Sequence, residues 1–218
     1  MTLFQYQPPL TPYLDILYQD DALLILNKPS GLLTVPGKAA EHQDCLERRV
    51  QRVYPEARIV HRLDMSTSGI VVMALGADAQ RHLNRQFELR KTNKHYIARV
   101  EGQLIADQGV VNLPLICDWP NRPKQMVCFA RGKQAVTEFV VLTRAHDSTK
   151  VKLIPITGRS HQLRVHMQWL GHPILGDKFY ASAEGVLAAS RLQLHAEYLA
   201  FLHPSTQKLV EFYAKCPF

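Results

Sequence analysis

The stretch HRLDMSTSGIVVMAL, residues 61–75, places a polar turn directly before an apolar run. Residues 70–75 are short, apolar and rich in β-branched side chains, which is typical of a buried strand. The turn holds a single acid, Asp64, followed by small residues at 66–69 whose hydroxyls and backbone groups can brace a fixed loop. This stretch therefore predicts a strand-containing fold with a rigid polar loop at the start of a central strand.

Asp64 has two interpretations. An isolated Asp at the start of a strand most often closes a turn, with its carboxylate accepting backbone N–H groups. The adjacent strand pattern indicates partial burial, which disfavours a charged carboxylate unless a cation lies nearby. An Asp kept ionised by an arginine on a rigid turn is suited to nucleophilic catalysis at a sugar or a base. Asp64 is thus the first candidate catalytic residue, with a structural turn as the alternative.

The balance of charge favours a polyanionic partner. The 218 residues include 26 Lys and Arg against 19 Asp and Glu, a formal net charge of +7. A basic surface attracts RNA, although charge alone does not identify an RNA-binding protein. The 4 cysteines are scattered, so reduced thiols are expected rather than disulfides or a metal site. The sequence has no signal-peptide pattern and no apolar run of membrane-span length, and we expect a soluble cytoplasmic protein.

Periodicity predicts one strand-rich domain over residues 1–218, beginning with an irregular arm at residues 1–12. A hairpin is expected over residues 14–31, followed by a helix over 45–54 that Asp44 caps. Further strands are expected at residues 70–75, 94–102, 110–116, 134–144, 150–157, 191–204 and 208–214. Further helices are expected at residues 78–90 and 160–171, the second with Ser160 as its N-cap.

The segment TGRSHQLRVH, residues 157–166, supplies cations that could accompany the acid of the turn. Arg159 and Arg164 lie near the expected N-terminal end of a helix, and either could be the cation that accompanies Asp64. Alternatively, Arg159 anchors a phosphate. His161 and His166 are five residues apart, which does not place them on one helix face as a metal-binding pair requires. We therefore predict no metal site, hydrogen bonding by His161, and packing or surface exposure for His166.

Other aromatic and basic residues suit contact with RNA. Tyr96 stands in an alternating strand pattern, where a tyrosine is most often a core residue; its functional alternative is stacking on a nucleobase. Arg85 shares a predicted helix face with a second arginine, a pair that is usually only solvated but that can also contact RNA. Arg122 and Lys124 make the proline-containing loop at residues 117–129 basic.

Four motifs, in this order, resemble the RluA family of pseudouridine synthases. They are HRLD-x-x-TSG at residues 61–69, K-x-Y-x-A at 94–98, TGR-x-HQ-x-R at 157–164 and LHA at 194–196. NKPSGLL at residues 27–33, DWPNRPKQ at 118–125 and GHPILGD at 171–177 are also similar to the family. The resemblance covers nearly the whole chain after the arm. DWPNRPKQ points to the branch of the family that modifies both ribosomal and transfer RNA.

The resemblance implies an α+β fold, with a mixed, mostly antiparallel central sheet flanked by helices and a catalytic cleft in the middle. It implies an isomerase without cofactor or metal that converts specific uridines of structured RNA to pseudouridine. The expected substrates are large-subunit ribosomal RNA and the anticodon stem-loop of transfer RNA. Many family members carry an extra N-terminal RNA-binding domain, for which the roughly 60 residues before HRLD leave no room. We expect a single catalytic domain that acts as a monomer.

The resemblance also implies roles for individual residues. Asp64 is the catalytic aspartate, Tyr96 stacks on the target uracil and acts near C5, and Arg164 forms the ion pair that holds Asp64 charged. Arg62 shares a face with Asp64 if the segment is extended, and we expect it to fill the space of a flipped base or to grip the adjacent phosphate. The other residues expected to contact RNA are His61, Arg159, His161, Arg122, Lys124 and Arg85.

The sequence leaves open two chemical routes for Asp64 and two alternative functions for the protein. The carboxylate of Asp64 can attack the sugar or the base, or it can remove a proton to generate a glycal. A non-catalytic RNA-binding or RNA-folding protein on the same fold is the alternative function, although the intact set of Asp64, Tyr96 and Arg164 argues against it. A glycoside or nucleoside hydrolase is a more distant alternative, because such enzymes usually need two carboxylates and the HRLD stretch offers one.

Overall fold

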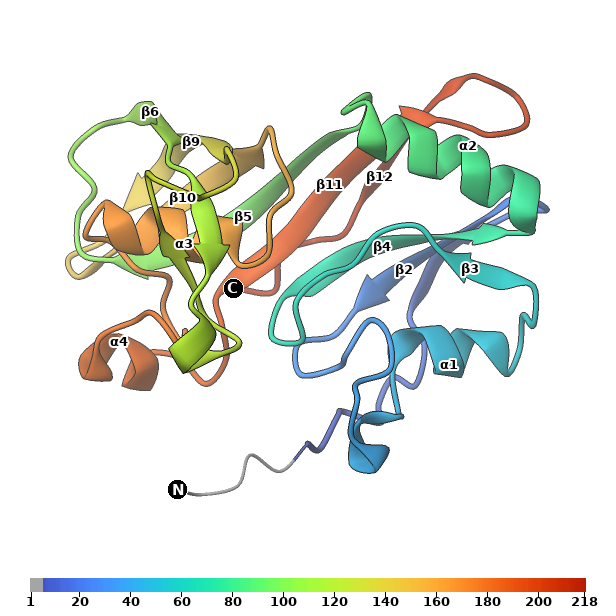
Figure 1. The fold of residues 1–218 in the computed structure, drawn as a ribbon, viewed down its shortest axis with the longest axis horizontal. Coiled ribbons are helices and arrows are strands. Elements are labelled where there is room, and N and C mark those ends of the chain that lie inside the picture. The colour runs from blue at the N-terminus through green and yellow to red at the C-terminus, as the bar shows by residue number, and fades with distance from the viewer. Residues whose placement is uncertain (1–5) are drawn as a thin grey trace. The chain divides into compact units, whose positions relative to one another are not determined.

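The computed structural model describes residues 6–218 (Figure 1), and the expectation for residues 1–5 of the arm lies outside this range. The chain divides into two compact units: unit 1 is Met1–Asn93 with Ala196–Lys215, and unit 2 is Lys94–His195 with Cys216–Phe218. Residues 6–12 contain no helix or strand, as predicted. The expectation of one catalytic domain stays a prediction. Among residues 6–218, no helix is long and apolar enough to cross a membrane.

Unit 1 consists of an antiparallel sheet with helices packed on it. Its strands are β1 (Ile16–Gln19), β2 (Leu23–Lys28), β3 (Ala57–Ile59), β4 (Ser68–Leu75), most of β11 (Leu194–Leu202) and β12 (Leu209–Tyr213). Its helices are the short 3₁₀ helix η1 (Ala40–His42), α1 (Leu46–Gln51) and α2 (Ala77–Glu88). β1 pairs with β2, β2 and β3 with β4, and β12 with β11, all antiparallel, and β11 neighbours β4.

The hairpin predicted over residues 14–31 is confirmed as β1 and β2. Asp20 closes its turn, because Oδ1 accepts the backbone N–H groups of Ala22 and Leu23, both at 2.8 Å. The helix predicted at residues 78–90 is confirmed as α2, which lies along β4 (Figure 1) and contributes Ala79 and Leu83 to the core of the unit.

The helix predicted after Asp44 begins where expected but ends earlier. Asp44 does not cap it; instead the carboxylate accepts both Nε and Nη2 of Arg49, at 2.8 and 2.7 Å. Arg49 is buried, and a buried guanidinium without a charged acceptor costs more free energy than an uncapped first turn. The carboxylate of Asp44 therefore pairs with Arg49. Val53, which falls within the helix predicted over residues 45–54, lies beyond the end of α1 and is 60% exposed.

Unit 2 contains four antiparallel strands of the ten-stranded sheet and a short two-stranded ribbon. The four strands are β5 (Asn93–Glu101), β6 (Gln108–Asn112), β9 (Val136–Arg144) and β10 (Ser148–Pro155), in the order β5-β10-β9-β6. The ribbon is β7 (Leu115–Cys117) and β8 (Gln125–Val127), joined through the 3₁₀ helix η2 (Trp119–Asn121). The helices are α3 (Gln162–Trp169) and α4 (Ala183–Leu187).

The strand expected at residues 110–116 is divided between β6 and β7, because Pro114 interrupts the pattern. Leu163 and Met167 of α3 pack into the core of unit 2 with Val151 and Leu153 of β10. The predicted α+β class, with a mixed, mostly antiparallel central sheet flanked by helices, is confirmed, since the named strands of the large sheet pair antiparallel within each unit. The catalytic cleft stays a prediction.

Candidate active site

The loop that carries Asp64 connects β3 to β4 in unit 1 and is fixed through its backbone. The carbonyl of Asp64 accepts the N–H of Thr67 at 3.1 Å, which closes a four-residue turn. The carbonyl of Leu63 accepts the hydroxyl of Thr34 at 2.8 Å, and the carbonyl of Ser66 accepts the hydroxyl of Ser30 at 2.7 Å. Asp64 itself is half-buried. The predicted rigid polar loop is therefore present, and its hydrogen bonds come from backbone and neighbouring segments.

Lys28 is a buried cation that ties this loop to the end of β2. Its ammonium donates to the carbonyls of Pro29, Leu32 and Met65 at 2.9, 2.7 and 3.1 Å, and the residue is 0% exposed. The backbone N–H of Gly31 also donates to Met65 O, at 2.9 Å. An ammonium has three hydrogens, so three carbonyls match its donor capacity. The sequence pattern did not lead us to predict a role for Lys28. The signal that could have indicated it is a lysine directly after the run LLILN, residues 23–27.

Gly69, the second residue of β4, lies at a place that has no room for a side chain. Its φ is +115°, and a Cβ placed there would lie 2.2 Å from the carbonyl oxygen of Ala196 on β11. Only glycine combines this backbone conformation with so close an approach. The glycine of the HRLD-x-x-TSG motif therefore fixes the start of β4 directly after the Asp64 loop.

His61 and Arg62, both predicted to contact RNA, differ in their surroundings. His61 Nε2 accepts the backbone N–H of Val72 at 3.1 Å, and the ring stacks on Phe87 with centroids 4.7 Å apart. The imidazole thus helps to attach the loop to β4 and α2. Arg62 is exposed. RNA contact by either residue stays a prediction.

Tyr96 lies in unit 2, on β5. It pairs with Leu153 of β10, is half-buried, and packs against the core of the unit. Lys94 precedes it by two residues and so faces the same side of the strand. Burial lowers the pKa of Lys94, which eases loss of its proton.

Arg164, on α3 of unit 2, forms a bidentate ion pair with Asp177. Nε and Nη2 each lie 2.7 Å from a carboxylate oxygen, and the side chains are 4% and 0% exposed. The guanidinium carbon lies 5.2 and 5.1 Å from the ring centroids of Phe179 and Tyr180. Asp177 belongs to the GHPILGD segment, and its local sequence does not indicate this role. The expected ion pair of Arg164 with Asp64 stays a prediction.

His161 precedes α3 in a left-handed conformation, with φ 54°. The helix therefore begins at Gln162, and the prediction that Ser160 is its N-cap was wrong. The side chain of Gln162 instead holds the turn before the helix. Its Oε1 accepts hydrogen bonds from the hydroxyl of Thr157 at 2.7 Å and from the N–H of Arg159 at 3.0 Å. The predicted hydrogen bonding of His161 is confirmed: Nδ1 lies 2.7 Å from the Tyr180 hydroxyl.

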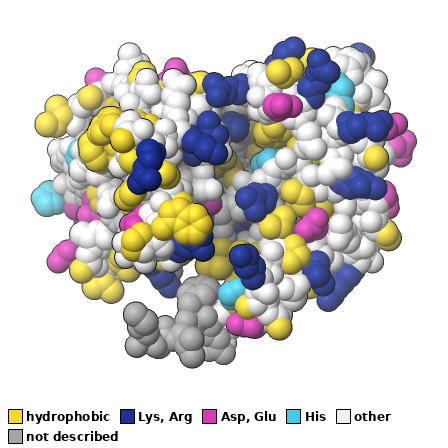
Figure 2. All heavy atoms as spheres, viewed as in Figure 1, with side chains coloured by type: hydrophobic (Ala, Val, Ile, Leu, Met, Phe, Trp, Pro, Cys, Tyr) yellow, Lys and Arg dark blue, Asp and Glu magenta, His cyan; other side chains and the backbone are white. Residues whose placement is uncertain are grey.

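The remaining candidates for RNA contact lie on exposed segments. Arg159 and Arg122 are exposed, and Lys124 is half-buried. Arg85 is exposed on α2, where it lines an open depression with Arg81, Asn84, Glu88 and Leu89. Figure 2 shows one face of the molecule, on which Lys and Arg side chains are prominent. Within residues 6–218, no group of three or more His, Cys, Asp or Glu side chains is arranged to hold a metal ion.

Asp64 belongs to unit 1, whereas Tyr96 and Arg164 belong to unit 2. Within unit 1 the structure brings together Asp64, its loop and the buried Lys28. Within unit 2 it brings together Arg164, Asp177 and the aromatic residues around them. Within residues 6–218, neither unit contains a GxGxxG nucleotide-binding loop. The Asp64 loop is held by hydrogen bonds to its backbone carbonyls, and Arg164 is held by its ion pair with Asp177.

These features are those of the RNA pseudouridylate synthase family, and the chain belongs to it. The sequence model of that family matches residues 22–169. A curated relative from Escherichia coli strain K12, named dual-specificity RNA pseudouridine synthase RluA, is 56% identical over 100% of both chains. The protein of the same name from Vibrio parahaemolyticus is 52% identical over 100% of this chain and 89% of its own.

Solved structures show the same fold. Human RNA pseudouridylate synthase domain containing 1 superposes with a TM-score of 0.80 at 30% sequence identity, covering 97% of this chain and 87% of its own. Human RNA pseudouridylate synthase domain containing 4 superposes with a TM-score of 0.75 at 27% identity, covering 93% and 88%. The chain is thus an isomerase of the pseudouridine synthase class, and RNA is its substrate, as the motifs predicted.

Proposed function

We propose that the protein converts specific uridines to pseudouridine in both large-subunit ribosomal RNA and the anticodon stem-loop of transfer RNA. The observation that carries this proposal is its identity of 56%, over the whole of both chains, with a relative whose name states dual specificity. The DWPNRPKQ segment, residues 118–125, supports the same assignment. The enzyme acts in the cytoplasm as a monomer and needs neither a metal ion nor an organic cofactor.

The reaction needs only acid–base and nucleophilic groups. The N1–C1′ bond of the uridine breaks, the uracil turns, C5 bonds to C1′, and the C5 proton leaves while N1 gains one. Asp64 is the reagent that opens this sequence, either by attack on the substrate or by removal of a sugar proton to give a glycal. The backbone hydrogen bonds at Leu63, Asp64 and Ser66 support this role, because they fix the loop before substrate arrives.

Arg164 keeps Asp64 ionised in this proposal. A guanidinium carries five N–H donors, and Asp177 accepts from Nε and Nη2. Asp177 therefore orients the guanidinium by accepting two of these N–H groups. Because the guanidinium is planar and presents its N–H groups in a fixed fork, the remaining N–H groups can donate to a second carboxylate. Tyr96 stacks on the target uracil and acts near C5.

Recognition requires the target base to leave its stack. A uracil within a helix cannot be reached, so the enzyme flips it from a loop or a helix end, where the cost is lower. Arg62 is exposed on the same loop as Asp64 and fills the vacated space or grips the neighbouring phosphate. His61, Arg159, His161, Arg122, Lys124 and Arg85 are proposed to contact the rest of the RNA.

Tritium release from RNA labelled at C5 of uridine tests the proposal. The substrates are a transfer-RNA anticodon arm and a large-subunit ribosomal hairpin, each offered to the wild-type protein and to Asp64→Asn. We expect release from both RNAs by the wild type and none by the variant. Release from only one RNA would contradict dual specificity. Binding of both RNAs without release from either, or from a broad RNA pool, would favour the non-catalytic alternative.

Dialysis against EDTA and size-exclusion chromatography with light scattering complete the test. Undiminished tritium release after dialysis is expected of a metal-independent enzyme. A mass near 24.8 kDa is expected of a monomer. Arg62→Ala is expected to weaken modification, and an Arg62→Ala protein that binds and modifies RNA normally would remove that residue from the mechanism.

A further inference from the structure

Both tryptophans of the chain are exposed, and both lie in unit 2. Trp119 is 64% exposed in η2, and Trp169 is 55% exposed at the end of α3. Phe129, which follows β8, is 71% exposed. Large aromatic side chains usually contribute to cores, and exposed ones grouped together mark an interaction site. These three rings have no role in the chemistry assigned to Asp64 and Tyr96.

The rings are held in fixed arrangements. The guanidinium carbon of Arg122 lies 3.3 Å from the ring centroid of Trp119, so the arginine covers one face of the indole. Phe129 and Trp169 meet edge to face, with centroids 6.2 Å apart and planes at 73°. Each arrangement holds its rings in place while leaving most of their surface accessible to solvent.

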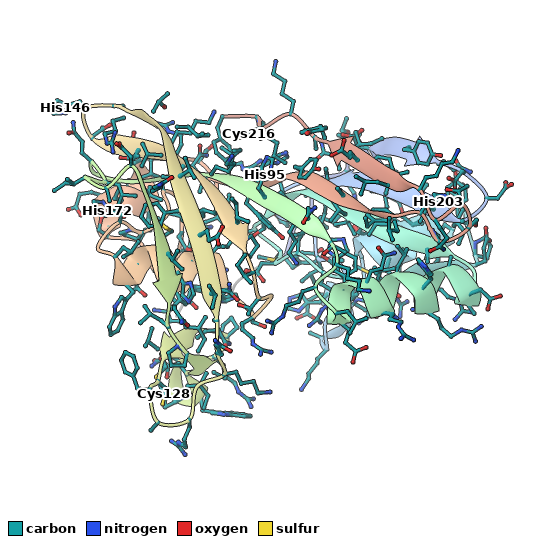
Figure 3. All side chains as sticks on the ribbon, turned by 90° about the horizontal axis from the view of Figure 1, so that it is seen from above. His95, Cys128, His146, His172, His203 and Cys216 are labelled. Atoms are coloured by element: carbon teal, nitrogen blue, oxygen red, sulfur yellow. The ribbon has the colours of Figure 1, made fainter. Side chains whose placement is uncertain are left out.

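The segment that carries Trp119 and Phe129 is rigid. Asp118 N donates to Lys124 O at 2.9 Å, and Lys124 N donates to Asn121 O at 3.0 Å, which closes the tip around η2. Gly132 N donates to Cys128 O at 2.8 Å, which closes the turn after β8. Figure 3 shows the ribbon bearing the labelled Cys128 projecting from the strands of unit 2. Trp119 and Phe129 thus stand on a projecting ribbon with little conformational freedom to lose on binding.

The same segment is basic. Residues 118–134 contain the four cations Arg122, Lys124, Arg131 and Lys133 and one acid, Asp118, a net charge of +3. Arg122, Arg131 and Lys133 are exposed. Aromatic rings interleaved with arginine and lysine are the combination that binds unpaired nucleotides, because bases stack on the rings while the cations contact the phosphates. An apolar protein partner would not require these charges.

We propose that Trp119 with Arg122, and Phe129 with Trp169, form two stacking positions for unpaired nucleotides of the RNA, distinct from the position of the reacting uridine. Trp119 in η2 precedes β8 and Phe129 follows it, so the two positions stand on either side of one short strand, whose three residues span about 10 Å at roughly 3.3 Å per residue. The proposal rests on the proposed function only in taking RNA as the ligand.

Binding of a fluorescently labelled anticodon-arm RNA tests this proposal in the full-length protein. We expect Trp119→Ala and Phe129→Ala each to raise Kd by about 5- to 100-fold, the loss of one base–aromatic stack. Trp119→Phe, which keeps a ring, should stay within a few-fold of wild type. Leu187→Ala is the matched control, because Leu187 is 86% exposed on α4 of the same unit, and it should bind like wild type.

Two further readouts separate stacking from other effects. The slope of log Kd against log salt should not change in Trp119→Ala, whereas Arg122→Ala should reduce it, because only the second loses a phosphate contact. RNA should quench the fluorescence of the wild-type protein, whose two tryptophans both lie at this surface. Because the rings are exposed, the thermal unfolding midpoint of the variants should match that of wild type.

Wild-type affinity in both Trp119→Ala and Phe129→Ala would overturn the proposal, as would an equal loss in Leu187→Ala. Loss of self-association in these variants, with unchanged RNA binding, would also overturn it and assign the surface to protein contact. The outcome is independent of catalysis. If wild type released no tritium while the aromatic variants lost RNA affinity, the proposed function would fail and the stacking positions would stand.

Discussion

Arg164 donates from Nε and Nη2 to the two carboxylate oxygens of Asp177, both at 2.7 Å, and neither side chain is more than 4% exposed. A buried ion pair of this geometry is costly to break from one side, because the remaining charge stays in a poorly solvated place. The pair also holds the guanidinium that the proposed mechanism needs next to the catalytic acid.

Asp177→Asn is therefore expected to lower the free energy of unfolding by about 3–5 kcal/mol. Urea unfolding followed by circular dichroism measures the change. Asp107→Asn is the matched control, because Asp107 also pairs with an arginine, Arg144, at 2.7 Å but is 85% exposed, and its loss should cost no more than about 1 kcal/mol. Similar losses in the two variants would contradict the prediction.

Replacement of Lys28 by methionine should affect both stability and turnover. The variant removes the ammonium from the carbonyls of Pro29, Leu32 and Met65 and leaves buried acceptors without a donor, at a cost of about 1–3 kcal/mol. Because Met65 directly follows Asp64, the loop should lose order and kcat should fall more than KM rises. Lys38→Met, at an exposed position, is the control and should change neither quantity. A Lys28→Met protein with wild-type kcat would show that the loop is held without the lysine.

His166 makes the stability of unit 2 depend on pH. It is buried, with Nε2 at 3.2 Å from the carbonyl of Leu113 and Nδ1 at 2.9 Å from the hydroxyl of Thr137. The carbonyl can only accept, so Nε2 carries the hydrogen and Nδ1 accepts from Thr137. Burial lowers the pKa of His166 below its usual value of 6.5.

Because the folded state then binds fewer protons than the unfolded state, the free energy of unfolding should fall as the pH drops below about 6.5. Above about pH 7.5 the histidine is neutral in both states and contributes no pH dependence. Urea unfolding at pH 7.5, 6.5 and 5.5 measures the slope. His166→Gln should have a shallower slope over this range than wild type. His146→Gln, at an exposed position, should keep the wild-type slope; equal slopes in all three proteins would exclude the role of His166.

Cys128 should be the most reactive thiol of the chain. The backbone N–H of Arg131 contributes most to lowering its pKa, and the N–H groups of Ala130 and Gly132 and the charge of Arg131 act in the same direction. Burial raises the pKa of Cys45, which is 0% exposed. Iodoacetamide at pH 7.5 should therefore alkylate Cys128 first and Cys45 last, because the thiolate is the reacting form.

Peptide mass spectrometry over a time course measures this order. In urea the rates at the two cysteines should become similar, since the folded environment is gone. Modification of the buried Cys45 at the rate of Cys128 in the folded protein would contradict the prediction.

Local pattern predicted most of the elements. The structure confirms the hairpin closed by Asp20, the helix α2 and the strands β11 and β12. These elements were predictable because hydrophobic periodicity and turn residues specify secondary structure within a few positions. The capping residues of α1 and α3 were predicted wrongly. At α1 the buried Arg49 takes Asp44 as its partner, and at α3 His161 adopts a left-handed conformation that displaces Ser160 from the cap position.

The candidate site was also predicted only in part from the sequence. Motifs indicated Asp64, Tyr96 and Arg164, because each stands in a short ordered pattern. The residues that hold them were missed. Lys28 meets Met65 across 37 positions and Asp177 meets Arg164 across 13, so nothing in the local sequence reveals either contact. Such partners depend on the tertiary fold that brings distant segments together.

Unit 1 is assembled from both ends of the chain, and this affects the order in which the protein can fold during its synthesis. Its core needs Leu199, Phe201 and Ala214, which the ribosome adds more than a hundred residues after β4. The main core cluster of unit 2 lies within residues 96–194 and can close before those residues emerge. The segment that carries Asp64 is therefore synthesised early but enclosed late, so a nascent chain orders its acid only after Leu199, Phe201 and Ala214 have emerged.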